Sequence, residues 1–200
     1  MRIFVGIKIS ADIAENVLQW RRSSQSPRLD AQCRWIEPKN LHTTLVPPWE
    51  ISDEAWNIKR EVLCRELRGV KFEPFEIKFN KIEFGPSFAQ PSLSLWPASK
   101  ATEGKPNHRP NLIWAIGQAN EAINNLRLAI YQKLGQEPDI RPFRLHCTLA
   151  RLKKFLPKEG EKVETLVDFR QEVRSFVLYR AHLLPQGADY EVLEEFKVED

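Results

Sequence analysis

Cysteine is scarce in this 200-residue chain and is poorly placed for a disulfide framework or a zinc site. The three cysteines, Cys33, Cys64 and Cys147, are an odd number, lie far apart and form no C-x-x-C pair. This pattern is typical of a protein from a reducing compartment. The sequence also lacks an H-E-x-x-H motif, a cluster of carboxylates and a Gly-rich phosphate loop. We therefore expect a protein that uses no metal and no cofactor.

Long hydrophobic runs are absent as well. Residues 1–8 are apolar, but polar residues follow at once, and the segment is too short for a signal sequence or a membrane span. We interpret it as a buried first strand and expect a cytoplasmic protein without membrane contact. The net charge of +3 permits an anionic substrate, but no concentrated basic stripe indicates a general nucleic-acid clamp.

What the chain does contain is one short motif that occurs twice. Residues 42–45 read His-Thr-Thr-Leu, and residues 146–149 read His-Cys-Thr-Leu. Successive side chains of a strand point to opposite faces, so His42 shares a face with Thr44, and His146 shares one with Thr148. The chain has only four histidines, so two that carry Thr at i+2 and Leu at i+3 are hard to attribute to chance.

The predicted elements follow the same order in each half of the chain: strand, helix, motif strand, helix, strand, strand. Strands are predicted over residues 2–9, 41–46, 72–84, 92–96, 111–116, 172–183 and 190–198, with the second motif strand after residue 142. Helices are predicted over residues 52–67, 118–134 and 158–169, with an earlier one that starts near residue 12, and loops over 22–30 and 97–110. Pro47 and Pro48 are expected to end the first motif strand.

An internal duplication is the simplest account of this order. It predicts one two-lobed α+β domain over residues 1–200, with sequence repeats of about 1–96 and 111–200 joined by the loop 97–110. We expect mainly antiparallel sheets that line a central cleft, with helices outside. The two motif strands would then face each other across the cleft.

Two histidines on either side of a cleft suit an in-line displacement at phosphorus. One imidazole removes a proton from the attacking oxygen while an imidazolium protonates the leaving oxygen, and the histidine pKa is close enough to neutral for both forms. The hydroxyls of Thr44 and Thr148 can donate to phosphate oxygens, and Arg151 can stabilise the charge that builds there. The spacing i, i+2 belongs to a strand, whereas zinc-binding helices place two histidines at i, i+4, so a metal site is the less favoured alternative.

With its flanking residues, the doubled motif resembles the signature of the two-histidine (2H) phosphoesterase superfamily. It is most similar to the RNA 2′,3′-cyclic phosphodiesterase branch, also called 2′-5′ RNA ligase-like. The similar segments read RIFVGI at residues 2–7, PKNLHTTL at 38–45, RPFRLHCTLAR at 141–151, LYR at 178–180 and YEVL at 190–193. The resemblance implies a bilobal fold in which both termini can contribute to one lobe. It also implies metal-independent opening of a 2′,3′-cyclic phosphate to a 2′-phosphate, with reversible 2′-5′ RNA ligation in some members.

Carried over by position, the resemblance implies that the catalytic residues are His42 and His146 and that the phosphate-binding residues are Thr44, Thr148 and Arg151. We expect His42 to be the acid for the leaving 3′ oxygen and His146 the base for water, because Arg151 follows the second motif while Pro47 holds the equivalent place after the first. The expected partner is an RNA end or a small nucleotide with a 2′,3′-cyclic phosphate, and the expected state is a monomer.

Other interpretations stay open. The same centre could act on another cyclic nucleotide or a 2′-5′ linkage, because residues 46–49 read Val-Pro-Pro-Trp where the family often has Phe-Leu-Gly. The chain could also be a non-catalytic RNA-binding module. Arg144 shares the face of His146 by alternation and is a further candidate. His108 and His182 have no Thr at i+2 and are expected to be structural or exposed.

Overall fold

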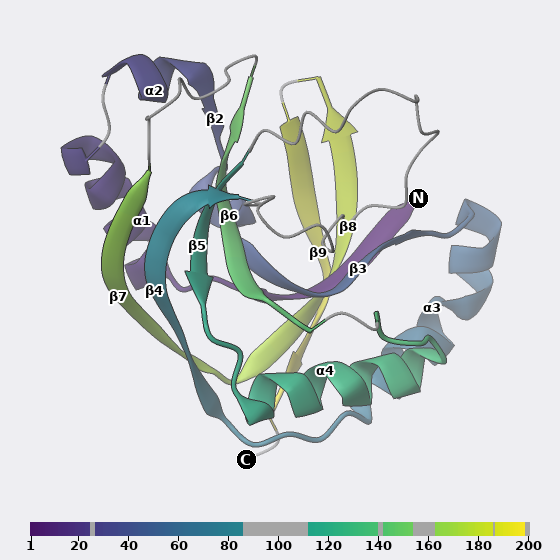
Figure 1. Cartoon of the computed structure of the whole chain (residues 1–200). Helices are drawn as coiled ribbons and strands as arrows, with labels where there is room; N and C mark the ends of the chain where they lie inside the picture. Colours follow the sequence, from purple (N-terminus) through teal and green to yellow (C-terminus); the bar gives the residue numbers. More distant parts are fainter. Residues whose placement is uncertain (25–26, 86–111, 140–141, 154–162, 186, 199–200) are drawn as a thin grey trace, which may run out of the picture.

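The computed structural model of the chain describes residues 1–24, 27–85, 112–139, 142–153, 163–185 and 187–198 (Figure 1). Its helices are α1 (Ala11–Ser24), α2 (Pro27–Gln32), the short 3₁₀ helix η1 (Pro38–Asn40), α3 (Asp53–Arg68) and α4 (Glu121–Leu134). Its strands are β1 (Arg2–Lys8), β2 (Cys33–Trp35), β3 (His42–Glu50), β4 (Phe75–Gly85), β5 (Leu112–Gly117), β6 (Leu145–Leu152), β7 (Glu164–Val173), β8 (Ser175–Leu184) and β9 (Gly187–Lys197). The predicted strand at 92–96 and loop at 97–110 lie outside the described residues.

The strands form two antiparallel sheets with related order. One sheet runs β3-β1-β8-β9 and the other β2-β6-β5-β4-β7. Counted from the motif strand, β3 pairs with β1 and β1 with β8, just as β6 pairs with β5 and β5 with β4. The first sheet joins β1 and β3 to β8 and β9 from the other end of the chain, so the sheets do not coincide with the sequence halves. The predicted α+β class with antiparallel sheets is confirmed; the duplication stays a prediction.

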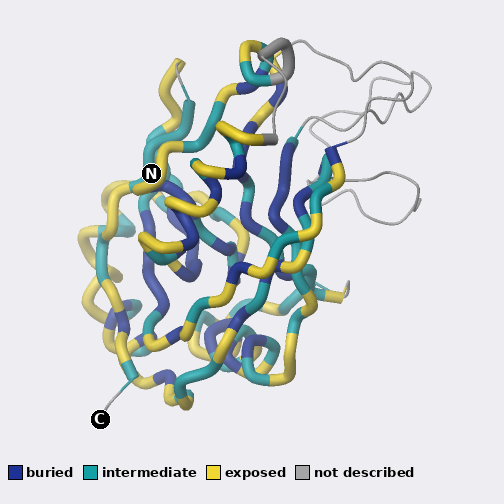
Figure 2. The backbone as a smooth tube through the Cα atoms, turned by 90° about the vertical axis from the view of Figure 1, so that its left-hand side faces the viewer, coloured by how far each residue is buried: buried dark blue, intermediate teal, exposed yellow. Residues whose placement is uncertain are grey.

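One hydrophobic core lies between the sheets and the helices. On β1, Ile3, Val5 and Ile7 are at most 1% exposed and belong to this core. Helix α4 adds Ile123 and Leu126 together with further residues at helical spacing, which matches the predicted amphipathic face. Figure 2 shows the buried segments of the tube inside the molecule and the exposed segments along its outer side.

A second, smaller buried cluster lies apart from that core. It consists of Phe4, Val177 and Tyr179, with Ala181 and Tyr190 packed against it. Because side chains alternate along β1, Phe4 points away from the core residues Ile3 and Val5. This cluster therefore covers the opposite face of the four-stranded sheet, the face on which His42 lies.

The two long predicted helices are confirmed, together with polar residues that begin them. Ser52 accepts a hydrogen bond from the backbone N–H of Ala55 (3.1 Å) at the start of α3. Asn120 accepts one from Ile123 (3.0 Å) at the start of α4. Each side chain satisfies a backbone donor that has no partner within the first turn. Gly135 ends α4 in the left-handed conformation, with φ of 62°, which a side chain would strain.

Three sequence-based predictions were wrong. Residues 164–169, predicted as part of a helix, belong to β7, because pairing with β4 overrides their local pattern. The predicted loop 22–30 contains the end of α1 and the start of α2, where Pro27 is tolerated because the first helical N–H needs no partner. Strand β3 continues through Pro47 and Pro48 to Glu50. Strand β3 lies at the edge of its sheet, with a neighbouring strand on one side only. A proline is tolerated there because its missing N–H does not remove a hydrogen bond between strands.

Candidate active site

The two motif strands meet although they belong to different sheets. Strand β3 contacts β6 directly. The hydroxyl of Thr43 donates to the backbone carbonyl of His146 over 3.1 Å, and the backbone of His42 opposes the rise that burial causes in the pKa of the Cys147 thiol. Strand β2 pairs with β6 only at residues 150–152, so it does not cover β6 at His146. The residues between His and Thr in each motif thus connect the two sheets.

Alternation along both motif strands is as predicted. His42 and Thr44 are half-buried, whereas Thr43 is 0% exposed. In β6 the half-buried residues are His146 and Thr148, and the intervening residue and the following leucine are buried. Each histidine therefore shares a partly open face with its threonine, and the intervening residues belong to the interior.

Both histidines are held by the same hydrogen bond. The Nδ1 atom of His42 lies 2.8 Å from the carbonyl oxygen of Asn40, and Nδ1 of His146 lies 2.9 Å from that of Arg144. A carbonyl oxygen only accepts, so Nδ1 carries the hydrogen in both rings. In the neutral imidazole, Nε2 is then the atom with the free lone pair. Each motif thus presents Nε2 as its proton-accepting atom.

His42 lies in an aromatic environment. Its ring centroid is 4.9 Å from that of Phe4, 4.8 Å from that of Tyr190 and 5.9 Å from that of Tyr179. Burial lowers the pKa of His42 to about 4; the hydrogen bond to Asn40 opposes this shift, and the positive charges of His146 and Arg151 add to it. His146 therefore lies close enough to act electrostatically on His42.

His146 packs against one large ring instead. Its centroid lies 4.4 Å from that of Trp114, which is 3% exposed. Burial lowers the pKa of His146, and the charge of Arg144 lowers it further, against the hydrogen bond to the Arg144 carbonyl. Trp114 in turn lies on Gly85, where a Cβ atom would come within 2.3 Å of the indole. Only glycine leaves Trp114 room to support His146.

A β-bulge decides where Arg151 points. Strict alternation would place Arg151 on the face opposite to Thr148. Trp114 of β5 pairs with Thr148, however, and the next β5 residue toward the N-terminus, Ile113, pairs with Ala150, so Leu149 is an extra residue. Arg151 thereby becomes exposed on the face of Thr148.

The bulge carries Arg151 toward the other motif. Its positive charge acts on Tyr190 of β9, where it opposes the rise in pKa that burial causes, and it lowers the pKa of His42. The sequence-based assignment of acid and base used only the position of Arg151 after the second motif; in the structure its charge acts on His42 of the first motif. The matching bulge in β3 lies at the same motif position, between Thr44 and Val46.

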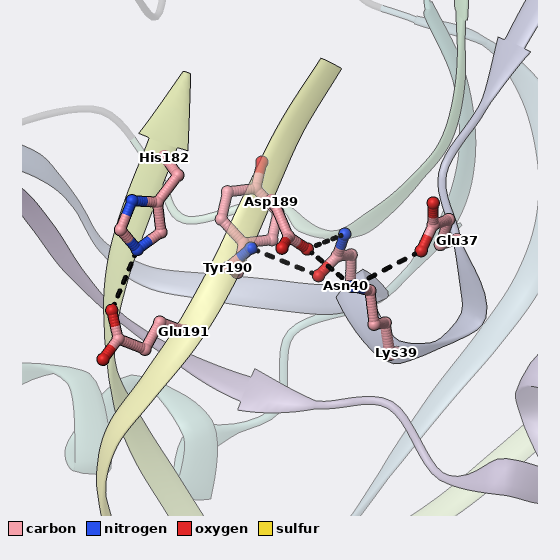
Figure 3. Close-up of polar contacts among 7 residues, drawn as sticks. All are labelled: Glu37, Lys39, Asn40, His182, Asp189, Tyr190 and Glu191. Carbon is pink, nitrogen blue, oxygen red and sulfur yellow. Dashed lines mark hydrogen bonds and ion pairs between the residues drawn. The ribbon is translucent and has the colours of Figure 1, made fainter. Parts of the chain in front are cut away.

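Asn40 is a site residue that the sequence analysis missed. Its side chain is 5% exposed; Nδ2 donates to Asp189 (3.0 Å), and Oδ1 accepts from the backbone N–H of Tyr190 (3.3 Å). Lys39 also contacts Asp189, at 3.0 Å (Figure 3). Because the Asn40 carbonyl holds His42, this network links the histidine to β9. The sequence feature that could have identified Asn40 is its position at the end of a turn, directly before Leu41 and His42.

Further observations concern the rest of the described structure. In the part of the chain that the structure describes, no three His, Cys, Asp or Glu side chains gather into a set that could hold a metal ion, and no helix is long and apolar enough to cross a membrane. That the reaction needs no metal stays a prediction.

A surface hollow of about 400 Å³ lies elsewhere and contains no motif residue. It is lined by Arg68, Val70, Lys71, Phe72, Glu73, Lys197 and Val198.

Comparison with known proteins finds similar phosphoesterases. The family described as LigT-like phosphoesterase matches residues 7–96, which include the first motif. An RNA 2′,3′-cyclic phosphodiesterase of Archaeoglobus fulgidus is 26% identical over 203 residues, covering 98% of this chain and 100% of the relative. The chain is therefore similar to the LigT-like phosphoesterase family in its first half and to RNA 2′,3′-cyclic phosphodiesterases over almost its whole length. A second such phosphodiesterase, from Aquifex aeolicus, is 27% identical over 98% of this chain and 96% of its own length.

Solved structures share the fold of this chain. Escherichia coli LigT complexed with 3′-AMP superposes with a TM-score of 0.68 at 20% identity and covers 100% of this chain and 98% of its own. A Thermus thermophilus protein superposes with a TM-score of 0.67 at 22% identity, over 99% and 98% of the two chains. At this identity the likeness concerns the architecture: two antiparallel sheets with few helices.

Proposed function

We propose that this phosphoesterase hydrolyses RNA 2′,3′-cyclic phosphate ends to 2′-phosphates, with His42 and His146 as its proton-transfer pair. The observation that carries the proposal is the contact between the motif strands of the two sheets, each with a half-buried histidine whose Nδ1–H is held by a backbone carbonyl. The names of the relatives from Archaeoglobus fulgidus and Aquifex aeolicus support the substrate. The site is complete within one chain, so we propose a monomer. Its cysteines are all free and buried, which fits a cytoplasmic location.

The reaction is an in-line displacement at the cyclic phosphorus. Nε2 of His146 takes a proton from water as the water oxygen bonds to phosphorus, and the bond from phosphorus to the 3′ oxygen breaks. Protonated Nε2 of His42 donates its proton to that oxygen, which leaves a 3′-hydroxyl and a 2′-phosphate. The hydroxyls of Thr44 and Thr148 donate to the non-bridging oxygens, and Arg151 stabilises their charge.

The acid must be protonated although its pKa is lowered in the free protein. A bound phosphate places a negative charge beside His42, and a nearby opposite charge favours the charged form of a titrating group. The cation of Arg151 acts in the opposite sense on His42. The substrate itself therefore has to raise the pKa of the acid, and we expect a bell-shaped dependence of kcat/KM on pH.

A product assay tests the reaction. A short RNA with a 2′,3′-cyclic end is incubated in EDTA with the wild type, His42→Ala, His146→Ala and the control His182→Ala. His182 bonds Glu191 on the β8–β9 hairpin and takes no part in the proposed chemistry (Figure 3). We expect a 2′-phosphate product from the wild type and the control, and loss of about 10²-fold or more in either motif variant. Most activity remaining in the double alanine variant would refute the proposal.

A substrate with a sulfur leaving group tests which histidine is the acid. In a cyclic substrate with sulfur in place of the 3′ oxygen, the departing thiolate needs no proton because it is far less basic than an alkoxide. If His42 is the acid, His42→Ala regains activity on this substrate while His146→Ala does not. Recovery of His146→Ala instead reverses the two roles.

A second enzymatic candidate is hydrolysis of another cyclic nucleotide or of a 2′-5′ linkage. Free cyclic nucleotides and 2′-5′ oligomers in the same assay separate it from the first. Binding of RNA that weakens with salt, without turnover of any of these substrates, would indicate a binding module instead.

A further inference from the structure

Two arginines stand directly opposite each other on neighbouring strands. Arg34 of β2 pairs with Arg151 of β6 in the antiparallel ladder, and both are exposed. Residues so paired have Cβ atoms about 5 Å apart on the same face, and like charges there repel. Among the described residues neither guanidinium forms an ion pair with a carboxylate, whereas Arg21 and Arg170 each pair with an aspartate.

Both arginines lie on the side of the active site. The bulge at Leu149 puts Arg151 on the face of Thr148, and cross-strand pairing puts Arg34 on that face too. The side chain of Arg34 passes Gly187, where a Cβ atom would lie 3.4 Å from its Cδ and 3.7 Å from its Nη1. Gly187 opens β9 three residues before Tyr190, so this contact is about 10 Å along the strand from the residue on which the charge of Arg151 acts.

Like charges that no carboxylate of the described residues pairs with indicate an anionic ligand at this position. A guanidinium presents its N–H groups in a planar fork that matches phosphate oxygens, and an anion shared by both arginines removes their repulsion. This argument rests on the proposed function, in which Arg151 faces the reacting phosphate. Arg34 lies on the neighbouring strand β2, beside Gly187, which is three residues along β9 from the Tyr190 ring that packs on His42. In a nucleotide held by its 2′,3′-cyclic phosphate, the next anionic group is the phosphate at the 5′ position.

We propose that Arg34, together with Arg151, forms a second phosphate subsite that binds the phosphodiester on the 5′ side of the terminal nucleotide. The subsite makes the protein select the end of an RNA chain over a free cyclic mononucleotide. The contact is electrostatic and independent of base identity, so it confers preference for a chain rather than for a sequence.

Paired substrates test the subsite with Arg34→Gln. One substrate is a nucleoside 2′,3′-cyclic phosphate without a 5′ phosphate; the other is a dinucleotide that ends in the same cyclic nucleotide. We expect Arg34→Gln to lower kcat/KM about tenfold on the dinucleotide and to leave the mononucleotide unchanged. The slope of log kcat/KM against log salt should fall by about 0.7 on the dinucleotide alone, the value for one lost phosphate contact on a single strand.

The control is Arg60→Gln, which removes the same charge from an exposed position on α3, well away from β2 in Figure 1. It should change neither substrate. Thermal unfolding gives a further check, because removing one of two repelling cations should leave the Tm of Arg34→Gln at or above that of the wild type. A structural role for Arg34 predicts a lower Tm and equal losses on both substrates, and that result would overturn the proposal.

A binding measurement keeps the subsite testable apart from the reaction. Titration calorimetry compares a nucleoside 2′-phosphate with a dinucleotide that ends in a 2′-phosphate. The wild type should bind the dinucleotide more tightly, and Arg34→Gln should lose that advantage. If neither cyclic substrate is turned over, the proposed function fails while this comparison still decides the subsite. Equal affinities in the wild type, or an unchanged ratio in the variant, would refute the subsite whatever the activity.

Discussion

Adjacent threonines in the first motif should have opposite phenotypes. Thr43 is 0% exposed and donates to the carbonyl of His146, whereas Thr44 is half-buried on the face of His42. Valine has nearly the same shape as threonine without the hydroxyl, so each change removes one hydrogen-bonding group with little change in packing. Thr43→Val should destabilise the fold, and Thr44→Val should impair catalysis.

The magnitudes follow from where each hydroxyl lies. Thr43→Val leaves a buried carbonyl without its donor, at a cost of about 1–3 kcal/mol. With an m-value of about 2 kcal/mol/M, a loss of 2 kcal/mol lowers the urea midpoint by about 1 M. Thr44→Val should change stability by no more than about 0.5 kcal/mol. If Thr44 donates to a non-bridging oxygen in the transition state, its loss lowers kcat by roughly 10²-fold or more.

Urea unfolding and kinetics on a cyclic-ended RNA, measured for both variants, check this pair. Thr43→Val should retain kcat/KM within about tenfold, because its hydroxyl does not face the substrate. The reasoning fails if Thr43→Val unfolds at the wild-type urea concentration. It also fails if Thr44→Val is the less stable of the two, because the assignment of faces on β3 would then be wrong.

Three further changes test the surroundings of the histidines. Gly85→Ala should push Trp114 off its position against His146, at a cost of about 1–3 kcal/mol measured by urea unfolding, with a lower kcat. Asn40→Ala should cost about 1–3 kcal/mol and lower kcat, because the buried amide connects β9 to the turn that holds His42. The pKa of His42, lowered by burial from 6.5 to about 4, predicts that the free energy of unfolding falls as pH drops through that interval, since the unfolded chain binds the proton more readily. The fall due to this residue is at most about 3 kcal/mol, and His42→Gln should remove it.

Each of these has a result that contradicts it. Wild-type stability in Gly85→Ala would mean that Trp114 does not need its present position. Normal kcat in Asn40→Ala would show that the position of His42 does not depend on the amide. For the pH dependence, the difference between wild type and His42→Gln isolates one residue from the carboxylates that titrate nearby. A difference that does not change between pH 7 and pH 4 would contradict the lowered pKa.

The local pattern was enough to predict which residues share a face of each motif strand. The repeat of His-x-Thr and the two-residue period of a strand placed His42 with Thr44 and His146 with Thr148, because alternation holds for any strand whatever its partners. Helix periodicity likewise identified α3 and α4, whose start and stop signals lie within the segments themselves.

Tertiary structure alone decided what depends on pairing between distant segments. Residues 164–169 form a strand because they pair with β4. Strand β3 continues through Pro47 because it lies at the edge of its sheet. The bulge that turns Arg151 toward His42 is a property of the pairing of β6 with β5, and the Asn40 network needs β9 from the other end of the chain. A single strand carries its own alternation, but its neighbours, its bulges and the sheet that it faces are set by contacts across the whole chain.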